Sequence, residues 1–182
     1  MLNSRRLITL GLLATVVASV VFLTRVSADD SSMTDAQIVR IKASCTSAKT
    51  SLNQLRVSDA LLRVNRGQMY DSMTSKLMSP FNSRVDSNNL NSKDLVSITN
   101  NYNTAFTTFS NDYQAYAEQL SSALNIDCQK EPVAFYDAVA SSRTKRGQVH
   151  SDVVILHQYI DDYATAFGTF VSDNQQTIGV GK

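Results

Sequence analysis

The sequence predicts an all-α protein, in which an N-terminal membrane-spanning or signal helix precedes an elongated up-down-up three-helix bundle of the coiled-coil type. In three long stretches, apolar residues recur at alternating spacings of three and four, the periodicity of a heptad seam. The 182 residues include only 6 glycines and 2 prolines, so few positions interrupt a helix. Short polar segments separate the three stretches, and short connections make neighbouring helices antiparallel.

The first 28 residues form the expected targeting segment. Two arginines precede the uncharged apolar run Leu7–Thr24, which ends at Arg25. A signal peptide cleaved after Ala28 and a retained spanning helix both remain open, because the run has a length at which the two classes overlap. Arg25 favours the retained anchor. We therefore expect a cell-membrane protein whose bulk is extracytoplasmic, or a secreted protein if the segment is cleaved.

Residues 29–174 have the composition of one folded domain. The whole chain is 43% hydrophobic and 18% charged, with a formal net charge of +1. This balance argues against nucleic acid as a partner and against a polybasic membrane patch. Residues 175–182 are expected to be a flexible tail.

The first predicted helix covers residues 34–79. Thr34 and Gln37 form a capping box at its start, and we expect the chain to double back near Pro80 because proline disfavours further helix. Its seam consists of Ile38, Ile41, Cys45, Ala48, Leu52, Leu55, Leu62, Met69 and Met73.

The second and third predicted helices cover residues 92–124 and 132–174. Asn91 with Asp94 caps the former, and Pro132 occupies a favourable first-turn position in the latter. The second seam consists of Leu95, Ile98, Tyr102, Ala105, Phe109, Tyr116 and Ala123. The third consists of Phe135, Val139, Val149, Val153, Leu156, Ile160, Tyr163, Phe167 and Phe170.

Cys45 and Cys128 are the only two cysteines. An exported chain can keep a disulfide, and a turn near Pro80 would return Cys128 to a height near Cys45. We predict a disulfide between them rather than two free buried thiols.

Two segments repeat an arginine motif: Arg63–Tyr70 reads RVNRGQMY and Arg143–His150 reads RTKRGQVH. Arg66 and Arg146 take the same seam position, so we expect them at the same height, within about one helical turn. Gly67 and Gly147 would let helix backbones approach, or leave room for the guanidinium groups. The sequence thus predicts a mid-bundle polar layer made by Asp59, Arg63, Arg66, Asp112, Arg143 and Arg146, with Asp59 and Arg63 paired along the first helix.

Two roles for this layer remain open. Buried ion pairs can fix helix register, and long arginine stems can simply carry their charges to the surface. Alternatively, convergent arginines suit a carboxylate or a phosphate. In that case the anion site would consist of Arg63, Arg66, Arg143 and Arg146.

A second internal repeat has the pattern YxTAFxTFxxD. It occurs at Tyr102–Asp112 and at Tyr163–Asp173. Aromatic residues at helical spacing are normally core packing, and the two repeats have different offsets, so they are not one tandem duplication.

One end of the bundle is a candidate partner-binding tip. The third helix is expected to run past the Pro80 turn, which leaves apolar side chains that need cover. They would bind a protein partner or a second copy, unless the turn region folds over them. The tip consists of Phe81, Phe167, Phe170 and Val171.

Two stretches, SDALLRVNRGQMYDSMTSKLMSPFNSR and CQKEPVAFYDAVASSRTKR, resemble small exported helical proteins of bacteria to which no function is attached. The resemblance covers most of the chain after the targeting segment. It implies an exported helical bundle and supplies no catalytic residue.

No motif for known chemistry stands out. There is no GxSxG elbow, phosphate-binding glycine loop, CxxCH haem site or zinc-finger cysteine spacing. His150, His157 and Asp161 share one helix face, but a metal there would need ligands from a second helix, so we interpret the histidines as structural. We predict no enzyme activity, no cofactor and no metal site.

The expected function is that of a membrane-anchored extracytoplasmic structural or protein-interaction module of the cell envelope. The alternative is a ligand-sensing or anion-binding bundle that uses the arginine layer. A dry, closed core with an apolar tip would favour the first function, and a bound anion or a pocket between Arg66 and Arg146 would favour the second.

Overall fold

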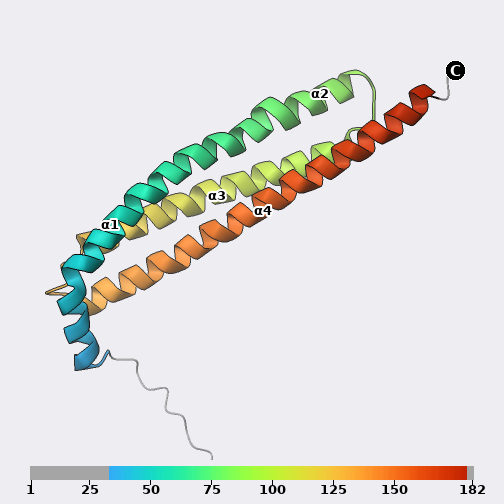
Figure 1. Cartoon of the computed structure of the whole chain (residues 1–182). Coiled ribbons are helices and arrows are strands. Elements are labelled where there is room, and N and C mark those ends of the chain that lie inside the picture. Colours follow the sequence, from blue (N-terminus) through green and yellow to red (C-terminus); the bar gives the residue numbers. More distant parts are fainter. Residues whose placement is uncertain (1–32, 180–182) are drawn as a thin grey trace, which may run out of the picture. The chain divides into compact units, whose positions relative to one another are not determined.

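The computed structural model describes residues 33–179, and this part of the chain is all-helical (Figure 1). Its elements are α1 (Asp35–Ser72), the π-helical segment η1 (Met73–Met78), α2 (Ser79–Ser87), α3 (Lys93–Asn125) and α4 (Pro132–Gly179). The prediction of an all-α protein is confirmed. Residues 33–179 include no helix long and apolar enough to cross a membrane, and the predicted targeting segment lies outside the described residues.

Local signals explain where two of the helices begin. The side chain of Thr34 accepts a hydrogen bond from the Gln37 N–H, and the Gln37 side chain accepts one from the Thr34 N–H, so the predicted capping box is confirmed. Helix α4 begins at Pro132, as predicted. At its other end α4 extends to Gly179, five residues beyond the predicted end of the third helix at residue 174.

The predicted turn at Pro80 is wrong, because the helix continues through the proline to Ser87. Proline lacks an N–H, and its ring clashes with the carbonyl four residues earlier in an α-helix. The wider η1 segment immediately before Pro80 relieves that conflict: the Ser79 N–H reaches back five residues to the carbonyl of Thr74. The chain instead turns after α2, where Asn89 adopts a left-handed conformation with a φ of 58°.

Contacts between helices follow one consistent order. The disulfide between Cys45 and Cys128 is present, which confirms the predicted pairing. Further along α1, Asp59 contacts Tyr116 on α3 and Arg146 on α4. Beyond it, the Tyr70 carbonyl accepts a hydrogen bond from Tyr102, and the Tyr70 hydroxyl lies 3.1 Å from Nε2 of His157. Finally Asn82 bonds to Thr99 and Tyr163. Later residues of α1 and α2 therefore contact earlier residues of α3 and later residues of α4.

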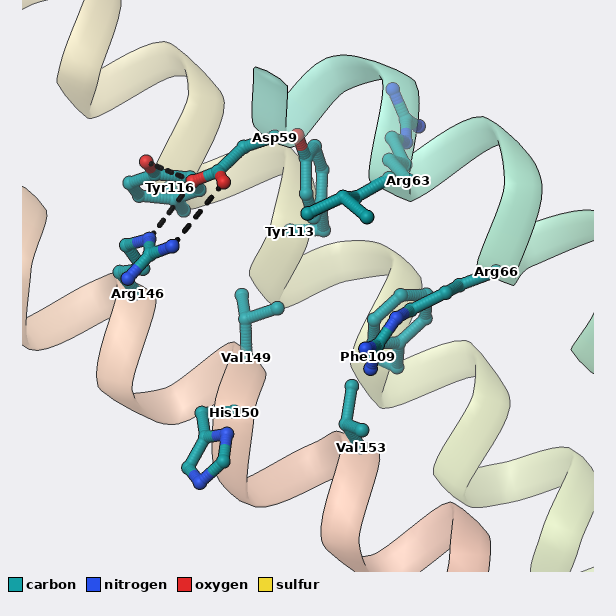
Figure 2. A pocket seen from close by; sticks show the side chains of 11 residues that line it. Asp59, Arg63, Arg66, Phe109, Tyr113, Tyr116, Arg146, Val149, His150 and Val153 are labelled. Atoms are coloured by element: carbon teal, nitrogen blue, oxygen red, sulfur yellow. Dashed lines mark hydrogen bonds and ion pairs between the residues drawn. The ribbon is translucent and has the colours of Figure 1, made fainter. Parts of the chain in front are cut away.

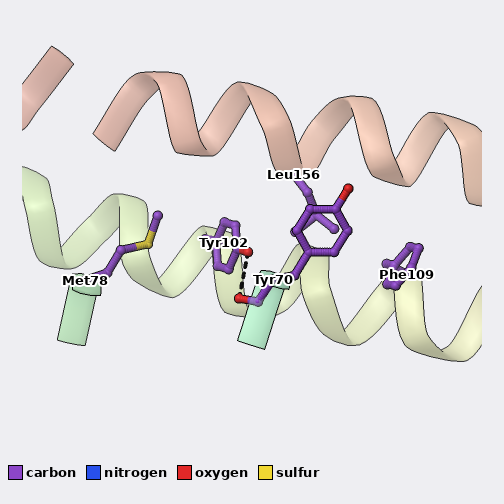
Figure 3. Packing of buried hydrophobic residues seen from close by; sticks show 5 residues of the cluster. All are labelled: Tyr70, Met78, Tyr102, Phe109 and Leu156. Atoms are coloured by element: carbon purple, nitrogen blue, oxygen red, sulfur yellow. Dashed lines mark hydrogen bonds between the residues drawn. The ribbon is translucent and has the colours of Figure 1, made fainter. Parts of the chain in front are cut away.

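The main apolar core lies where α1 passes into η1 (Figure 3). Tyr70 is completely buried there, with its ring edge-on to Phe109, and the Tyr102 hydroxyl donates to the Tyr70 carbonyl at 2.9 Å. Aromatic rings in this geometry stabilise a core beyond their buried area. The buried members of this cluster are Tyr70, Met78, Tyr102, Phe109 and Leu156.

Helix α1 is poorly covered in its middle, whereas α3 and α4 pack together along most of their lengths. The seam residues Leu62 and Met69 are 48% and 46% exposed, although the heptad pattern predicts them as core. The middle of α1 therefore lies over the α3–α4 pair without sealing against it, and this creates the space in which the candidate site lies.

Candidate functional site

The site is organised around Asp59, a buried carboxylate on α1 that is 6% exposed. Nε and Nη2 of Arg146 on α4 donate to its two oxygens at 2.9 and 3.3 Å. The hydroxyl of Tyr116 on α3 donates to Oδ2 at 2.7 Å. One carboxylate thus joins all three long helices (Figure 2), and its charge is matched by a guanidinium in the fork geometry that arginine favours.

These contacts shift the acid–base properties of the group. Burial alone would raise the pKa of Asp59, but the hydrogen bonds from Arg146 and Tyr116 outweigh it, so the pKa lies below its ordinary value. Burial and the adjacent Asp59 carboxylate raise the pKa of Tyr116. Asp59 is therefore an anion and Tyr116 a neutral donor at neutral pH.

A cavity of about 220 Å³ lies beside this layer, between α1, α3 and α4. Arg63 places its guanidinium carbon 5.1 Å from the ring centre of Tyr113, a cation–π arrangement. The side chain of Arg66 makes no hydrogen bond or ion pair within residues 33–179. Figure 2 shows its side chain extending from α1 toward Phe109 and Val153. The lining consists of Asp59, Leu62, Arg63, Arg66, Phe109, Tyr113, Tyr116, Arg146, Val149, His150 and Val153.

The predicted polar layer is therefore only partly assembled. Asp59 and Arg146 meet, and Arg63 and Arg66 line the same cavity. Arg143 is exposed on α4 and does not line the cavity. The predicted pairing of Asp59 with Arg63 is wrong, since Arg146 takes the carboxylate and Arg63 stacks on an aromatic ring.

The expectation that Arg66 and Arg146 lie at one height is also wrong. The two arginines are 80 residues apart in sequence. The contacting pairs of α1 and α4, Asp59 with Arg146 and Tyr70 with His157, are both 87 residues apart. The difference is one heptad, about 10 Å of helix. A heptad seam fixes which face packs, and a slide of seven residues preserves that face, so the repeat alone could not fix the register.

The two glycines of the repeated motif do not serve close packing. Beyond the adjacent residues and the backbone of its own helix, a Cβ added at Gly67 or at Gly147 would meet no atom within 4 Å among the described residues. The hypothesis that these glycines let helix backbones approach is wrong, because both positions face open space.

Asp112, also expected in the layer, lies beside another acid. Asp152 on α4 is 8% exposed, and its Oδ2 has no hydrogen-bond partner in the described structure. Burial, the charge of Asp112 and a hydrogen bond with that carboxyl raise the pKa of Asp152. The environment of this acidic pair therefore differs chemically from that of the arginine cavity.

Sequence reasoning missed a basic stripe on α1. Lys42, Lys49, Arg56 and Arg63 recur at intervals of seven residues, and none forms an ion pair within residues 33–179. Lys49 and Arg56 line a groove of about 530 Å³ between α1 and α3. The seven-residue spacing of these basic residues can be read from the sequence, but the net charge of the whole chain, which is near zero, does not reveal it. We call these four residues the basic stripe.

The predicted tip residues come together without forming an open apolar end. The ring of Phe81 lies 4.9 Å from Phe167 and 5.6 Å from Phe170, edge-on in both cases. Val85 of α2 is 4% exposed, so α2 supplies much of the cover. Val171 is half-buried, while Phe167 remains 40% exposed. The continuation of the helix past Pro80 provides this cover.

The histidines have separate environments. His150 lies at the edge of the cavity, and His157 contacts the hydroxyl of Tyr70. Within the described part of the chain, no group of three or more His, Cys, Asp or Glu side chains could hold a metal ion.

Comparisons with protein-family models, with curated proteins and with solved structures found no match to this chain.

Proposed function

We propose that the protein is a membrane-anchored, extracytoplasmic interaction module of the cell envelope whose α1 helix binds an acidic helical segment of another protein. The observation that carries this proposal is the basic stripe. Between Arg40 and Arg66, α1 carries six basic residues and one acid, Asp59, whose charge is taken by Arg146. A chain with a net charge of +1 has thus concentrated uncompensated positive charge on its least covered helix.

The spacing of the stripe suits a helical partner. Four charges at intervals of seven residues span 21 residues, about 32 Å of helix. A straight helix laid alongside presents carboxylates at the same interval if acidic residues recur every seven positions. Such charge pairs steer association and set the alignment of the two helices.

Exposed apolar side chains lie next to the stripe on the same helix. Val57, Leu61 and Val64 are 53%, 64% and 54% exposed. Their spacing of four and three places them on one helix face. Burying them against a partner would contribute about 25 cal/mol for each Å² of apolar surface removed from water.

A second copy of the chain fits this surface poorly. No two acidic residues anywhere in the sequence are seven residues apart, so the chain offers no complementary acidic stripe. An anionic lipid surface also fits poorly, because Lys49 and Arg56 lie beside a groove between two helices, where a flat surface cannot follow. An elongated acidic segment of a different protein fits best.

The remaining parts of the proposal concern location and layout. In the sequence α1 follows the predicted anchor within a few residues, so in this proposal the basic stripe begins close to the membrane surface. The Cys45–Cys128 disulfide supports an exported location, since disulfides persist in oxidising compartments.

Site-specific photocrosslinking in the protein's own membranes tests the proposal. A photoreactive residue replaces Thr50, which lines the α1–α3 groove, and in a control chain it replaces Asp137, which is exposed on α4. We expect the Thr50 probe to capture another protein through a segment with regularly spaced acids. Arg56→Glu should abolish that capture, whereas Arg143→Glu, a matched reversal on α4, should leave it unchanged.

Three outcomes would overturn the proposal. They are capture of lipid alone, capture of a second copy alone, and capture that Arg56→Glu does not weaken. Capture from the Asp137 position with equal yield would show that the contact is not specific to α1, and would also count against the proposal.

A further inference from the structure

The cavity beside Asp59 has an unbalanced charge. Of its charged lining groups, Asp59 and Arg146 neutralise each other through two hydrogen bonds. Arg63 and Arg66 remain, and no acid within residues 33–179 pairs with either. Three positions apart on α1, they are neighbours on the helix surface, with Cβ atoms about 5–6 Å apart. The Arg63 guanidinium stacks on Tyr113, whereas the Arg66 side chain extends over Phe109 with no counter-ion among the described residues (Figure 2). A guanidinium without a counter-ion at the wall of a cavity is a site for an oxyanion.

Apart from His150, the rest of the lining is apolar or consists of the rings of phenylalanine and tyrosine. Phe109 is 3% exposed, and it forms the floor with Val149 and Val153 (Figure 2). Tyr113 is held neutral, since burial and the nearby Asp59 carboxylate raise its pKa. A ligand that fills this space therefore has an apolar body at one end and negative charge at the other.

The volume limits the size of that body. At about 220 Å³ the cavity is smaller than the roughly 300–1,000 Å³ of pockets for drug-sized ligands. Apolar cavities of about 150 Å³ hold one benzene ring. The space therefore accommodates a single six-membered ring with one anionic substituent.

We propose that this cavity binds a small aryl oxyanion, a single aromatic ring bearing a carboxylate or a phosphate. The ring packs against Phe109 and Val153, and the oxyanion accepts hydrogen bonds from Arg66, while Arg63 on the Tyr113 ring adds a second positive charge to the cavity wall. This site is separate from the α1–α3 groove of the proposed function. Arg66 belongs to the cavity alone, whereas Arg63 also belongs to the basic stripe.

Ligand-observed fluorine NMR on the full-length chain tests this inference. The probes are 4-fluorobenzoate and 4-fluorophenyl phosphate, with 4-fluorobenzamide as the neutral control and inorganic phosphate as the competitor without a ring. We expect at least one aryl oxyanion to bind, the benzamide to bind at least tenfold more weakly, and inorganic phosphate to compete poorly. The affinities of 4-fluorobenzoate and 4-fluorophenyl phosphate, compared with each other, show whether the site prefers a carboxylate or a phosphate.

Two variants with one control locate the binding. Arg66→Gln removes the charge and keeps a polar, unbranched side chain, so affinity should fall about tenfold, whereas Arg143→Gln should leave it unchanged. Val153→Phe fills the cavity and keeps every charge, so binding should be lost while the helical circular dichroism and the melting transition persist. Three results would overturn the inference: no binding of either aryl oxyanion, equal binding of the benzamide, or unchanged affinity in both Arg66→Gln and a folded Val153→Phe.

Discussion

Asp59 on α1 and Arg146 on α4 form a two-pronged ion pair, with Nε to Oδ2 at 2.9 Å and Nη2 to Oδ1 at 3.3 Å. Within residues 33–179 it is the only ion pair between different helices, since the other joins Lys130 to Asp127 in the connection before α4. It lies between the disulfide and the Tyr70 core, where α1 has few apolar contacts, so it holds the middle of α1 over α3 and α4. The same pair leaves the neighbouring arginines without a counter-ion.

Replacing Asp59 by asparagine should destabilise the bundle by about 1–3 kcal/mol. Removing one member of a buried pair typically costs about 3–5 kcal/mol, but the Arg146 side chain is 52% exposed, so water compensates for part of the loss. Urea unfolding of the oxidised chain measures the effect. Asp137→Asn, at an exposed site on α4, is the matched control. Equal stability of the two variants would show that the pair does not hold α1.

Removing the Tyr116 hydroxyl should cost about 1.5–3 kcal/mol, the range for a hydrogen bond to a charged group. This hydroxyl donates to Oδ2 of Asp59 at 2.7 Å, and Tyr116 is 2% exposed. Tyr116→Phe therefore deletes one buried bond and keeps the ring. Tyr136→Phe is the control, because Tyr136 is 53% exposed. A loss no larger than that of the control would contradict the account of the layer.

The Asp59 carboxylate should make the bundle sensitive to acid. Its folded-state pKa is lowered from the ordinary 3.8, so its contribution to stability is fully present above that value. The contribution is lost as the pH falls through the folded-state pKa. Melting temperatures of the wild type and Asp59→Asn should therefore converge in acid, and a gap that stays constant would rule out this linkage.

The Asp112–Asp152 pair should act in the opposite direction. The folded-state pKa of Asp152 is raised, so its stabilising effect is present below the ordinary value of 3.8 and is lost as the pH rises through the raised value. Asp152→Asn should therefore be more stable than the wild type at neutral pH and should lose that advantage in acid. Asp162→Asn, on the exposed surface of α4, serves as the comparison. A variant less stable than the wild type at neutral pH would refute the raised pKa.

Loss of the disulfide should cost about 4–5 kcal/mol in the chain-entropy model, because the two cysteines are 83 residues apart. The double variant Cys45→Ser with Cys128→Ser removes the bond without leaving a reactive thiol. Urea unfolding of this variant and of the oxidised wild type gives the difference. A loss below about 1 kcal/mol would mean that the unfolded chain is already restricted near these residues.

The sequence was most informative where a signal is local. The Thr34–Gln37 capping box and the proline at the start of α4 depend on a few neighbouring residues, and both are present. The disulfide could be predicted because only two cysteines exist. The turn predicted at Pro80 is wrong because the prediction assumed α-helical geometry, in which the proline ring clashes with the carbonyl four residues earlier. The wider η1 segment avoids that clash without a turn.

The candidate site was harder to predict because it depends on register. The heptad pattern placed Asp59, Arg66 and Arg146 on seams, but a slide by one heptad leaves each on its seam and changes its partner. The Tyr116 seam position predicted burial, and no sequence signal identified the acceptor of its hydroxyl. The cavity arises from incomplete closure of α1 over α3 and α4, which is a property of the tertiary packing.

The most direct test of the central claim, that the basic stripe on α1 binds an acidic partner, is the mass of the complex extracted from the native membranes. Light scattering coupled to size exclusion, in mild detergent at low salt, compares the wild type with Lys49→Glu/Arg56→Glu and with the control Arg143→Glu. The account predicts that the wild type and the control elute with a second, different protein, and that the double reversal elutes without it. Elution of all three chains at the same mass would contradict the claim.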